Sequence, residues 1–480
     1  MKIAVSLHQQ NERTLRNNKE INVNKDMQQQ SAPTTLGTES IRKLLMQYAG
    51  PAIIAMTASS LYNMVDSIFI GQGVGPLAIS GLAITFPVMN LSAAFGAMVG
   101  VGASTLLSVK LGQKDYTTAQ NILGNVITLN TIIGVIFGVL MLLFINPILY
   151  FFGASDATIS YARDYMTIIL LGNVITHMYL GLNAMLRSAG HPQQAMYATI
   201  GTVIINTILD PLFIYTFDMG IKGAAIATVM AQTIALCWQL KLFSNKNEMI
   251  HLRRGTFALK RKIVSNSLAI GLSPFLMNLC ACFVVILINK GLQKHGGDLA
   301  IGAYGIANRV VFFFVMIVMG INQGMQPIAG YNYGARQFER VNKVLRLTIY
   351  AATIVTTCTF LVGVFIPEFI ARIFTTDKEL IKQAANGLSL LVLAFPFVGF
   401  QMVTVNFFQS IGIAKKSIFL SLTRQLLFLI PLLLILPNFF GQNGVWIAAP
   451  ISDTLSSILA GWMLYKQFQL FKNEKSTNPL

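Results

Sequence analysis

Two aspartates stand inside long apolar stretches of this sequence and are the residues best suited to chemistry. Asp66 lies in LYNMVDSIFI, and Asp210 lies in IINTILDPLF. A charged side chain in lipid is costly, so a carboxyl group there normally faces the protein interior or a wet cavity. Burial disfavours the charged form of a carboxyl group, and a second carboxyl nearby disfavours it further. Such groups can exchange protons near neutral pH. The alternatives are a wetted helix end at Asp66 or a structural hydrogen-bond network that fixes helix packing.

Each aspartate has an amide side chain close before it. Asn206 precedes Asp210 by one helical turn, and Asn63 precedes Asp66 by three residues, so both pairs share a helix face. Pro211 follows Asp210 directly and has no backbone N–H. We therefore expect the helix to kink next to this carboxyl group.

The composition is that of a polytopic membrane protein. Of the 480 residues, 54% are hydrophobic and only 11% are charged, and the mean hydropathy is +0.61. A soluble chain carries about a quarter charged residues. The net charge of +17 is scattered over the connections between apolar segments instead of one solvated face, which argues against a nucleic-acid partner. No metal-binding motif is present, and no cofactor is expected.

Twelve apolar segments are long enough to cross a membrane, since about 20 helical residues span the hydrocarbon core. They cover residues 43–70, 76–109, 117–152, 157–189, 193–217, 221–244, 261–291, 298–333, 338–367, 380–411, 416–437 and 442–470. The predicted fold is therefore all-α, with twelve transmembrane helices.

The positive charges predict how the chain is oriented. Most of the 35 Lys and Arg residues lie in the amino-terminal tail, in the connections on the same side and in the carboxyl tail. Positive loops stay in the cytoplasm, so both termini are expected there. The expected units are a disordered tail (1–40), an N-terminal six-helix lobe (41–244), a cytoplasmic linker (245–260), a C-terminal six-helix lobe (261–471) and a second cytoplasmic tail (472–480).

Glycines recur at a fixed spacing in the two halves. Gly112 and Gly334 stand in similar connections, as do Gly190 and Gly412, and both pairs are 222 positions apart. Because six spans return the chain to the same side, the halves are parallel repeats related by an axis along the membrane normal. We therefore predict two six-helix lobes around a central cleft.

The two halves differ at the aspartates. Asp66 aligns near Ile288 and Asn289, and Asp210 aligns near Leu432, so neither has an acidic counterpart. Chemistry that involves protons or cations is therefore expected in the N-terminal lobe.

Hydroxyl groups fall at the same depth as Asp210. Tyr165 and Thr228 are about seven or eight residues from the outer ends of their spans, or ~10 Å at helical rise. Acidic, amide and hydroxyl side chains thus meet at one level of one lobe. The predicted proton or cation site contains Asp66, Asp210, Asn206, Tyr165, Thr228 and Asn63.

A third aspartate, Asp453, lies in the last span among serines and threonines. It could bind a cation or a substrate, but we expect the local hydroxyl groups to satisfy it.

Four segments resemble the multidrug and toxic compound extrusion (MATE) family, in particular its MepA-like bacterial branch. They are LYNMVDSIFIGQGVGPLAISGLA (61–83), NTILDPLFI (206–214), GIKGAAIATVMAQ (220–232) and GMQPIAGYNYGA (324–335). The resemblance covers residues 40–470, with the twelve spans and the twofold repeat.

The resemblance implies an antiporter of the bacterial inner membrane that exports drugs, dyes and biocides by alternating access. Its substrates would be organic, mostly cationic or amphipathic compounds, and protons or Na⁺ would flow inward in exchange. The partners expected are these compounds and membrane lipids, and the chain is expected to be a monomer.

The family pattern also implies site residues. Its proton-coupled form matches Asp66, Asp210, Asn206, Tyr165 and Thr228. The sodium-type acids of the carboxyl lobe are replaced here by amides, which puts a cation site there in doubt but leaves Na⁺ at the amino-lobe acids open. Flexible methionine surfaces accept varied ligands. The expected substrate pathway includes Asn183, Met178, Met89, Gln323 and Gln401.

Two other functions are weighed against export. A lipid-linked oligosaccharide flippase of the same superfamily requires a cationic cleft for pyrophosphate, and only Arg309 and Arg424 lie inside spans. An intramembrane enzyme requires a metal motif or a catalytic signature around the aspartates, and the sequence has neither. We therefore do not expect an enzyme.

Overall fold

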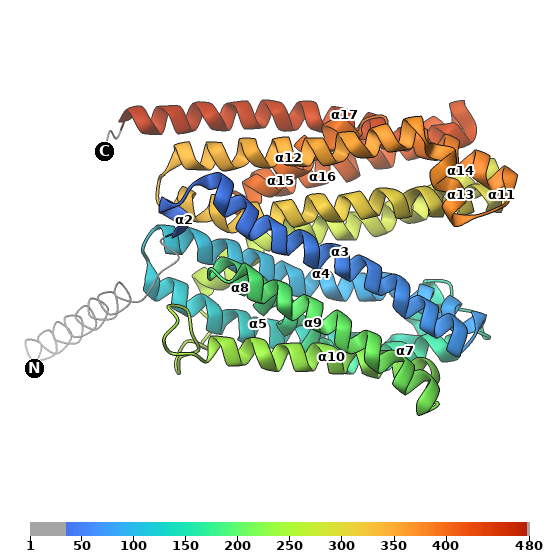
Figure 1. Cartoon of the computed structure of the whole chain (residues 1–480), viewed down its shortest axis with the longest axis horizontal. Helices are drawn as coiled ribbons and strands as arrows, with labels where there is room; N and C mark the ends of the chain where they lie inside the picture. The colour runs from blue at the N-terminus through green and yellow to red at the C-terminus, as the bar shows by residue number, and fades with distance from the viewer. Residues whose placement is uncertain (1–34, 478–480) are drawn as a thin grey trace, which may run out of the picture.

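The computed structural model describes residues 35–477, apart from the side chains of residues 63, 64, 76, 298 and 474–477. Within this range the regular structure consists of helices, which run side by side in one long bundle (Figure 1).

The first half of the chain forms the helices between residues 35 and 243. They are α2 (Thr35–Thr38), α3 (Ile41–Gly73), α4 (Pro76–Gly112), α5 (Tyr116–Leu143), α6 (Ile145–Phe151), α7 (Ile159–Leu171), α8 (Asn173–Ser188), α9 (Pro192–Pro211), the π-helical η1 (Leu212–Thr216) and α10 (Gly220–Phe243).

The second half begins at residue 261. Its helices are α11 (Arg261–Gly334), α12 (Phe338–Phe365), α13 (Pro367–Phe374), α14 (Lys378–Leu391), α15 (Phe395–Ser410), α16 (Ala414–Leu422), the π-helical η2 (Thr423–Leu429) and α17 (Ile430–Thr477).

Twelve membrane spans are present in the described chain, as the sequence predicts. Nine helices are long and apolar enough to cross a membrane, and two bent pairs, α7 with α8 (56°) and α14 with α15 (54°), raise the number to eleven. The ninth helix covers 60 residues from 414 to 473, or ~90 Å at helical rise, which is far more than a bilayer requires. It is divided at Gly441, where φ is 56°, and this division gives the twelfth span.

The same turns recur in the two halves, which confirms the predicted repeat. Residues with positive φ lie at corresponding turns, where the chain needs the left-handed conformation that glycine adopts most easily. Three pairs are each 222 positions apart: Gly75 and Gly297, Lys114 and Arg336, Gly190 and Gly412.

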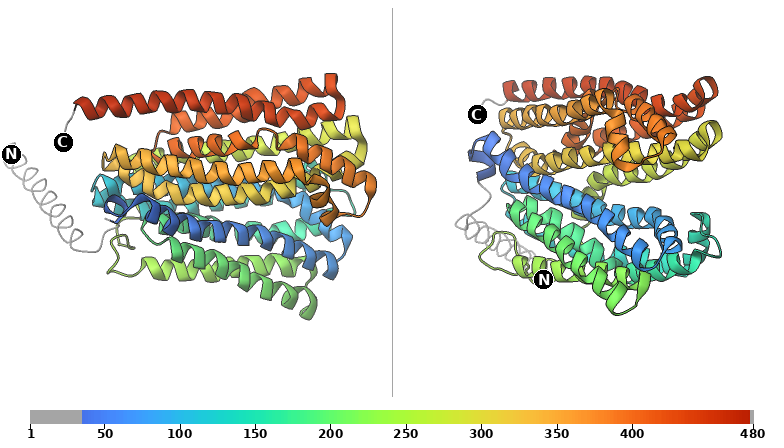
Figure 2. Two further views of the ribbon diagram at one scale, coloured as in Figure 1. Left: turned by 45° about the horizontal axis from the view of Figure 1, so that its top comes forward. Right: turned by 45° about the vertical axis from the view of Figure 1, so that its right-hand side comes forward.

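The helices form two lobes (Figures 1 and 2). Helices α4–α10 build the N-terminal lobe and α11–α17 build most of the C-terminal lobe, with α3 between them. The end of α17 and the short helix α2 lie at one end of the bundle, which we call the terminal end (Figure 1). The other end, which carries the turn between α3 and α4, is called the opposite end.

The first span of each half starts in the core of the other half. Ile41 and Tyr48 of α3 pack into the apolar core of the C-terminal lobe. Ile263 and Ile270 of α11 pack into the core of the N-terminal lobe. The lobes are therefore interlocked at the terminal end.

Residues 35–40 are folded, although the sequence analysis assigned them to a disordered tail. Leu36 is fully buried. Its carbonyl oxygen accepts hydrogen bonds from Asn332 Nδ2 at 3.0 Å and Arg340 Nη2 at 2.9 Å, and Arg340 also donates to the carbonyl of Glu39 at 2.7 Å. These partners are about 300 residues away in sequence, so local composition could not predict them. The rest of the predicted tail, residues 1–34, lies outside the described range.

The linker between the lobes is bound to the N-terminal lobe. Asn125 Nδ2 donates to the carbonyl of Thr256 at 3.1 Å, and Asn125 Oδ1 accepts from the backbone N–H of Lys260 at 2.8 Å. Gln120 forms hydrogen bonds with the backbone of His251. The linker is thus a strap on α5 that leads directly into α11.

Glycines bring the lobes into backbone contact at the terminal end. A Cβ atom on Gly102 of α4 would lie 1.8 Å from the carbonyl oxygen of Ser267, and one on Gly271 of α11 would lie 1.8 Å from that of Met98. A Cβ atom on Gly112 would lie 1.9 Å from the carbonyl oxygen of Tyr331. We call this contact the glycine seam.

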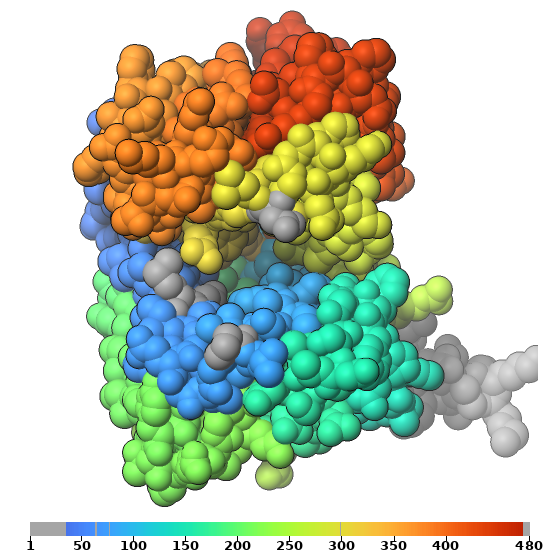
Figure 3. Space-filling model, turned by 90° about the vertical axis from the view of Figure 1, so that its right-hand side faces the viewer, coloured from blue at the N-terminus to red at the C-terminus, as the bar shows by residue number. Residues whose placement is uncertain are grey.

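The corresponding contact on the other side of the repeat axis completes the seam. A Cβ atom on Gly334 would lie 2.1 Å from the carbonyl oxygen of Val109, and one on Gly324 would lie 2.5 Å from the backbone of Ala49. At the opposite end the lobes part, and a cleft opens between the blue-to-green and the yellow-to-red halves (Figure 3).

The seam makes a direct prediction about stability. Gly102→Ala and Gly271→Ala each place a methyl group against backbone that cannot yield easily, and overpacking of this kind costs about 1–3 kcal/mol. Both variants should unfold at lower temperature than the unaltered protein in detergent. Gly50→Ala and Gly201→Ala are the controls, because nothing lies within 4 Å of the added Cβ atom at either position. Equal melting temperatures in all five proteins would contradict the role of the seam.

Candidate functional site

Asp66 and Asp210 meet inside the N-terminal lobe, where α3 packs against α9. Their exposed fractions are 7% and 0%. The two carboxyl groups are close neighbours. One oxygen of each, Oδ1 of Asp66 and Oδ2 of Asp210, is buried with no hydrogen-bond partner among the described residues. Two carboxylates only accept hydrogen bonds, so a bond between them requires a proton on one of them.

A chain of hydrogen bonds runs into this carboxyl pair. Asn206 Nδ2 donates to Asp210 Oδ1 at 2.7 Å, and Thr228 Oγ1 donates to Asn206 Oδ1 at 3.4 Å. The single Thr228 proton is then used, so Tyr62 Oη, at 3.2 Å from Thr228 Oγ1, is the donor of that bond. Every donor in the chain points toward Asp210.

Tyr165 closes the site from α7. It is 1% exposed, and its side chain is within hydrogen-bonding reach of Thr228. The structure therefore brings together five of the residues that the sequence selected: Asp66, Asp210, Asn206, Tyr165 and Thr228. The sixth, Asn63, has a side chain that lies outside the described residues. Tyr62 was missed, although its position one helical turn before Asp66 could have indicated it.

The helix widens into a π-helical turn directly after Asp210 and Pro211. Pro211 cannot donate a backbone hydrogen bond, and its ring crowds the preceding turn. The chain continues through the π-helical η1, in which the N–H of Phe217 donates to the carbonyl of Leu212 at 3.0 Å. A π-helical turn of this kind is common at functional sites.

Most of the predicted substrate-pathway residues are packed inside the lobes. Asn183 is 7% exposed and donates to the carbonyl of Ala195 at 2.9 Å, and Gln401 is 3% exposed. Met178 and Met89 pack against the two apolar cores of the N-terminal lobe. These four side chains therefore take part in the packing of the helices.

Gln323 is the pathway residue that lies between the lobes. Its Nε2 atom is 3.3 Å from Met56 Sδ of α3. It directly precedes Gly324 of the glycine seam in the sequence.

Asp453 is paired with an arginine and not with the nearby hydroxyl groups, which corrects the expectation from sequence. Arg424 Nε donates to Asp453 Oδ1 at 2.7 Å, and their side chains are 23% and 6% exposed. Ser452 and Ser457 donate to the backbone carbonyls of Arg424 and Asp453 instead. The hydroxyl groups next to Asp453 in the sequence thus bond to backbone carbonyls. The partner of the Asp453 carboxyl group, Arg424, comes from η2.

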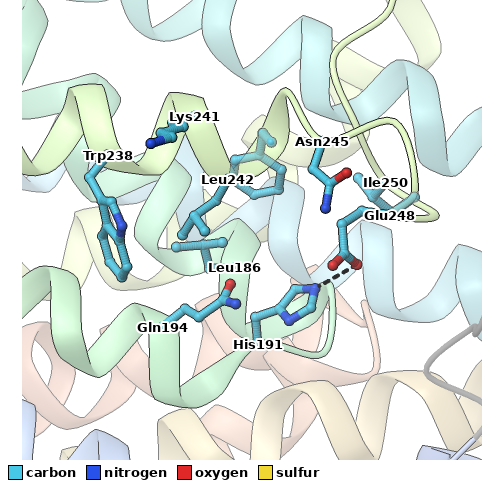
Figure 4. A pocket seen from close by; sticks show the side chains of 10 residues that line it. Leu186, His191, Gln194, Trp238, Lys241, Leu242, Asn245, Glu248 and Ile250 are labelled. Carbon is cyan, nitrogen blue, oxygen red and sulfur yellow. Dashed lines mark hydrogen bonds and ion pairs between the residues drawn. The ribbon is translucent and has the colours of Figure 1, made fainter.

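A separate cavity of about 300 Å³ lies at the terminal end. Trp238 and Lys241 of α10 line one side, and the linker covers another with Glu248, which is 3.0 Å from His191 Nε2 (Figure 4). Asp210 lies eighteen residues further along α9 than Pro192, or ~27 Å at helical rise. The cavity therefore belongs to the packing of the linker and is distant from the carboxyl pair.

Comparisons with known proteins agree with this architecture. The MatE family model matches residues 51–212 and 269–435. The multidrug export protein MepA of Staphylococcus haemolyticus (strain JCSC1435) is 27% identical over 426 residues, covering 89% of this chain and 94% of that protein. MepA of Staphylococcus aureus (strain MSSA476) is 26% identical over 423 residues, covering 88% and 93%.

A solved structure gives the same result. The MATE multidrug transporter DinF-BH is 37% identical with a TM-score of 0.84, and the match covers 91% of this chain and 98% of that one. The family match extends over more than half of the sequence. This chain therefore belongs to the MATE family of transporters.

Proposed function

We propose that this protein is a multidrug efflux antiporter that exports organic, largely cationic or amphipathic compounds in exchange for protons. The observation that carries the proposal is the buried carboxyl pair of Asp66 and Asp210, which lies at the end of an oriented hydrogen-bond chain. The MepA relatives, named as multidrug export proteins, support the direction of transport.

The proton cycle follows from the arrangement of the pair. In the state that is open at the opposite end, a second proton neutralises both carboxyl groups and removes the remaining buried charge. The N-terminal lobe then repacks around α3 and η1, and the drug is released from the cleft. When the lobes open at the terminal end, the proton leaves on that side and a new drug molecule enters.

The charged connections between the helices predict how the protein is oriented in the membrane. The positive loops assign the terminal end to the cytoplasm of a bacterial cell, so the cleft opens outward and protons enter from outside. The protein acts as a monomer among membrane lipids. Sodium is the alternative coupling ion, because Na⁺ is bound through oxygen atoms and the site offers carboxyl, amide and hydroxyl oxygens.

A flippase for lipid-linked oligosaccharides is favoured less. A pyrophosphate group calls for more than one free cation, and Arg424 is already neutralised by Asp453. Arg309, the other candidate from the sequence, would then have to hold the pyrophosphate group alone.

Removing the carboxyl pair should abolish coupling. In liposomes with only a pH gradient, Asp66→Asn and Asp210→Asn should each reduce dye efflux by at least about tenfold, because a single remaining acid cannot share a proton with a carboxyl partner. Asp156→Asn is the matched control, since this acid contacts Tyr150 at the surface. Full efflux in the double Asn variant would refute the proposed role of the carboxyl pair. Efflux that is driven only by a sodium gradient would show that the coupling ion is Na⁺ and not the proton.

The Arg424–Asp453 pair should be structural. Asp453→Leu leaves a buried guanidinium unpaired, and breaking such a pair costs about 3–5 kcal/mol. The variant should melt at a clearly lower temperature in detergent, whereas Arg424→Met with Asp453→Leu should recover most of the stability and keep drug efflux. A stable double variant without efflux would show instead that the pair takes part in transport.

A further inference from the structure

Arg309 lies deep within the C-terminal lobe, on the second part of α11. It follows the break at Gly297 by twelve residues, or ~18 Å at helical rise. Its side chain is exposed. An exposed guanidinium at this depth is very costly in lipid, so it must face water.

The face of α11 that carries Arg309 is the one that packs against α3, the helix between the two lobes. Residues 309, 313, 316, 320 and 324 follow one another at spacings of three and four and share one side of the helix. A Cβ atom on Gly320 would lie 2.6 Å from the backbone of Ile53, and Gly324 touches Ala49. The same face continues toward the opposite end, where the lobes part and a cleft opens between them (Figure 3).

No described residue neutralises Arg309. Its guanidinium forms no hydrogen bond or ion pair with the described residues, in contrast to Arg424, which is held by Asp453. The carboxyl groups of Asp66 and Asp210 are buried in the other lobe and turned toward each other. This wall of the cleft is therefore positively charged.

The surroundings of Arg309 leave room for an aromatic ligand. Gly305, one turn away on the same face, has nothing within 4 Å of the position of a Cβ atom. Phe313, one turn away on the other side, is 39% exposed. An open surface, a cation and an apolar ring thus follow one another along α11.

The charge has no counterpart in the repeat. The residue 222 positions before Arg309 is Pro87, so the fold itself does not require a cation here. A charge that is unpaired, costly and absent from the other half is best explained by a ligand.

We propose that Arg309 binds the carboxylate of aromatic, zwitterionic substrates in the cleft. This inference rests on the proposed export function and deepens it by assigning a residue that distinguishes substrates with an acidic group from simple cations. The guanidinium donates two hydrogen bonds to a carboxylate in a fixed geometry. The aromatic body of the substrate packs on Phe313 and over Gly305.

The experiment compares two dyes that differ in one group, a rhodamine with a free carboxylate and its ethyl ester. Fluorescence anisotropy with the purified full-length protein in detergent measures Kd for each dye. Arg309→Gln should weaken binding of the acid roughly 10- to 100-fold, as expected for loss of a charge-assisted contact, and should leave binding of the ester unchanged or tighter. Arg309→Lys should keep part of the affinity for the acid.

The control is Arg372→Gln, since Arg372 is an exposed residue of α13 paired with Glu368; it should change neither Kd. Ester binding and melting temperature show that each variant is folded. Equal weakening of both dyes, no weakening of the acid, or no acid binding by the unaltered protein would each overturn the inference. Binding requires no gradient, so a failure of proton-driven efflux would refute the proposed function and leave this result standing.

Discussion

The close approach of α4 and α11 at the terminal end is the contact on which the rest of the structure depends. Inside a bilayer the lipid tails are as apolar as leucine, so helices gain little by hiding apolar side chains from lipid. Backbone contact through glycine replaces that driving force. Gly102 and Gly271 let the two helices meet at a separation that no side chain would allow. With this end closed, the diverging lobes create the cleft at the other end.

The interlocked first spans connect the seam to the carboxyl pair. Helix α3 begins in the core of the C-terminal lobe, passes the seam at Ala49 and reaches Asp66 in the N-terminal lobe. A movement that separates the lobes at the terminal end must therefore displace or bend α3. In the proposed antiport cycle, the protonation of Asp66 and the opening of the seam both act on this helix, which gives a physical route for coupling them.

Much of the architecture could be predicted from the sequence, because it depends on local quantities. Hydropathy and length predict the twelve spans, and the glycine spacing predicts the repeat. The reasons for that spacing differ, however. Gly190 and Gly412 adopt positive φ, whereas Gly112 and Gly334 allow close approach, and only coordinates separate these cases.

The misses share one cause, which is a partner that is distant in sequence. Asp453 is satisfied by Arg424 from a neighbouring helix, and residues 35–40 are held by Arg340. The acid cluster could be predicted because the ends of a span set the depth of each residue. The ends of a span do not determine which way the helix directs a side chain. Asn183, which the family resemblance puts on the substrate pathway, donates instead to the carbonyl of Ala195 in α9.

The charges of the two lobes are arranged in opposite ways, and in the proposed mechanism this separates the coupling proton from the substrate. The acids of the N-terminal lobe are buried and face each other, so in this open state they do not form the surface that a drug meets. The wall of the other lobe presents Arg309 to the cleft. A proton and a substrate at different places cannot exchange by competing for one group. Their coupling must then pass through the packing between the lobes, where α3 and the glycine seam join the two halves.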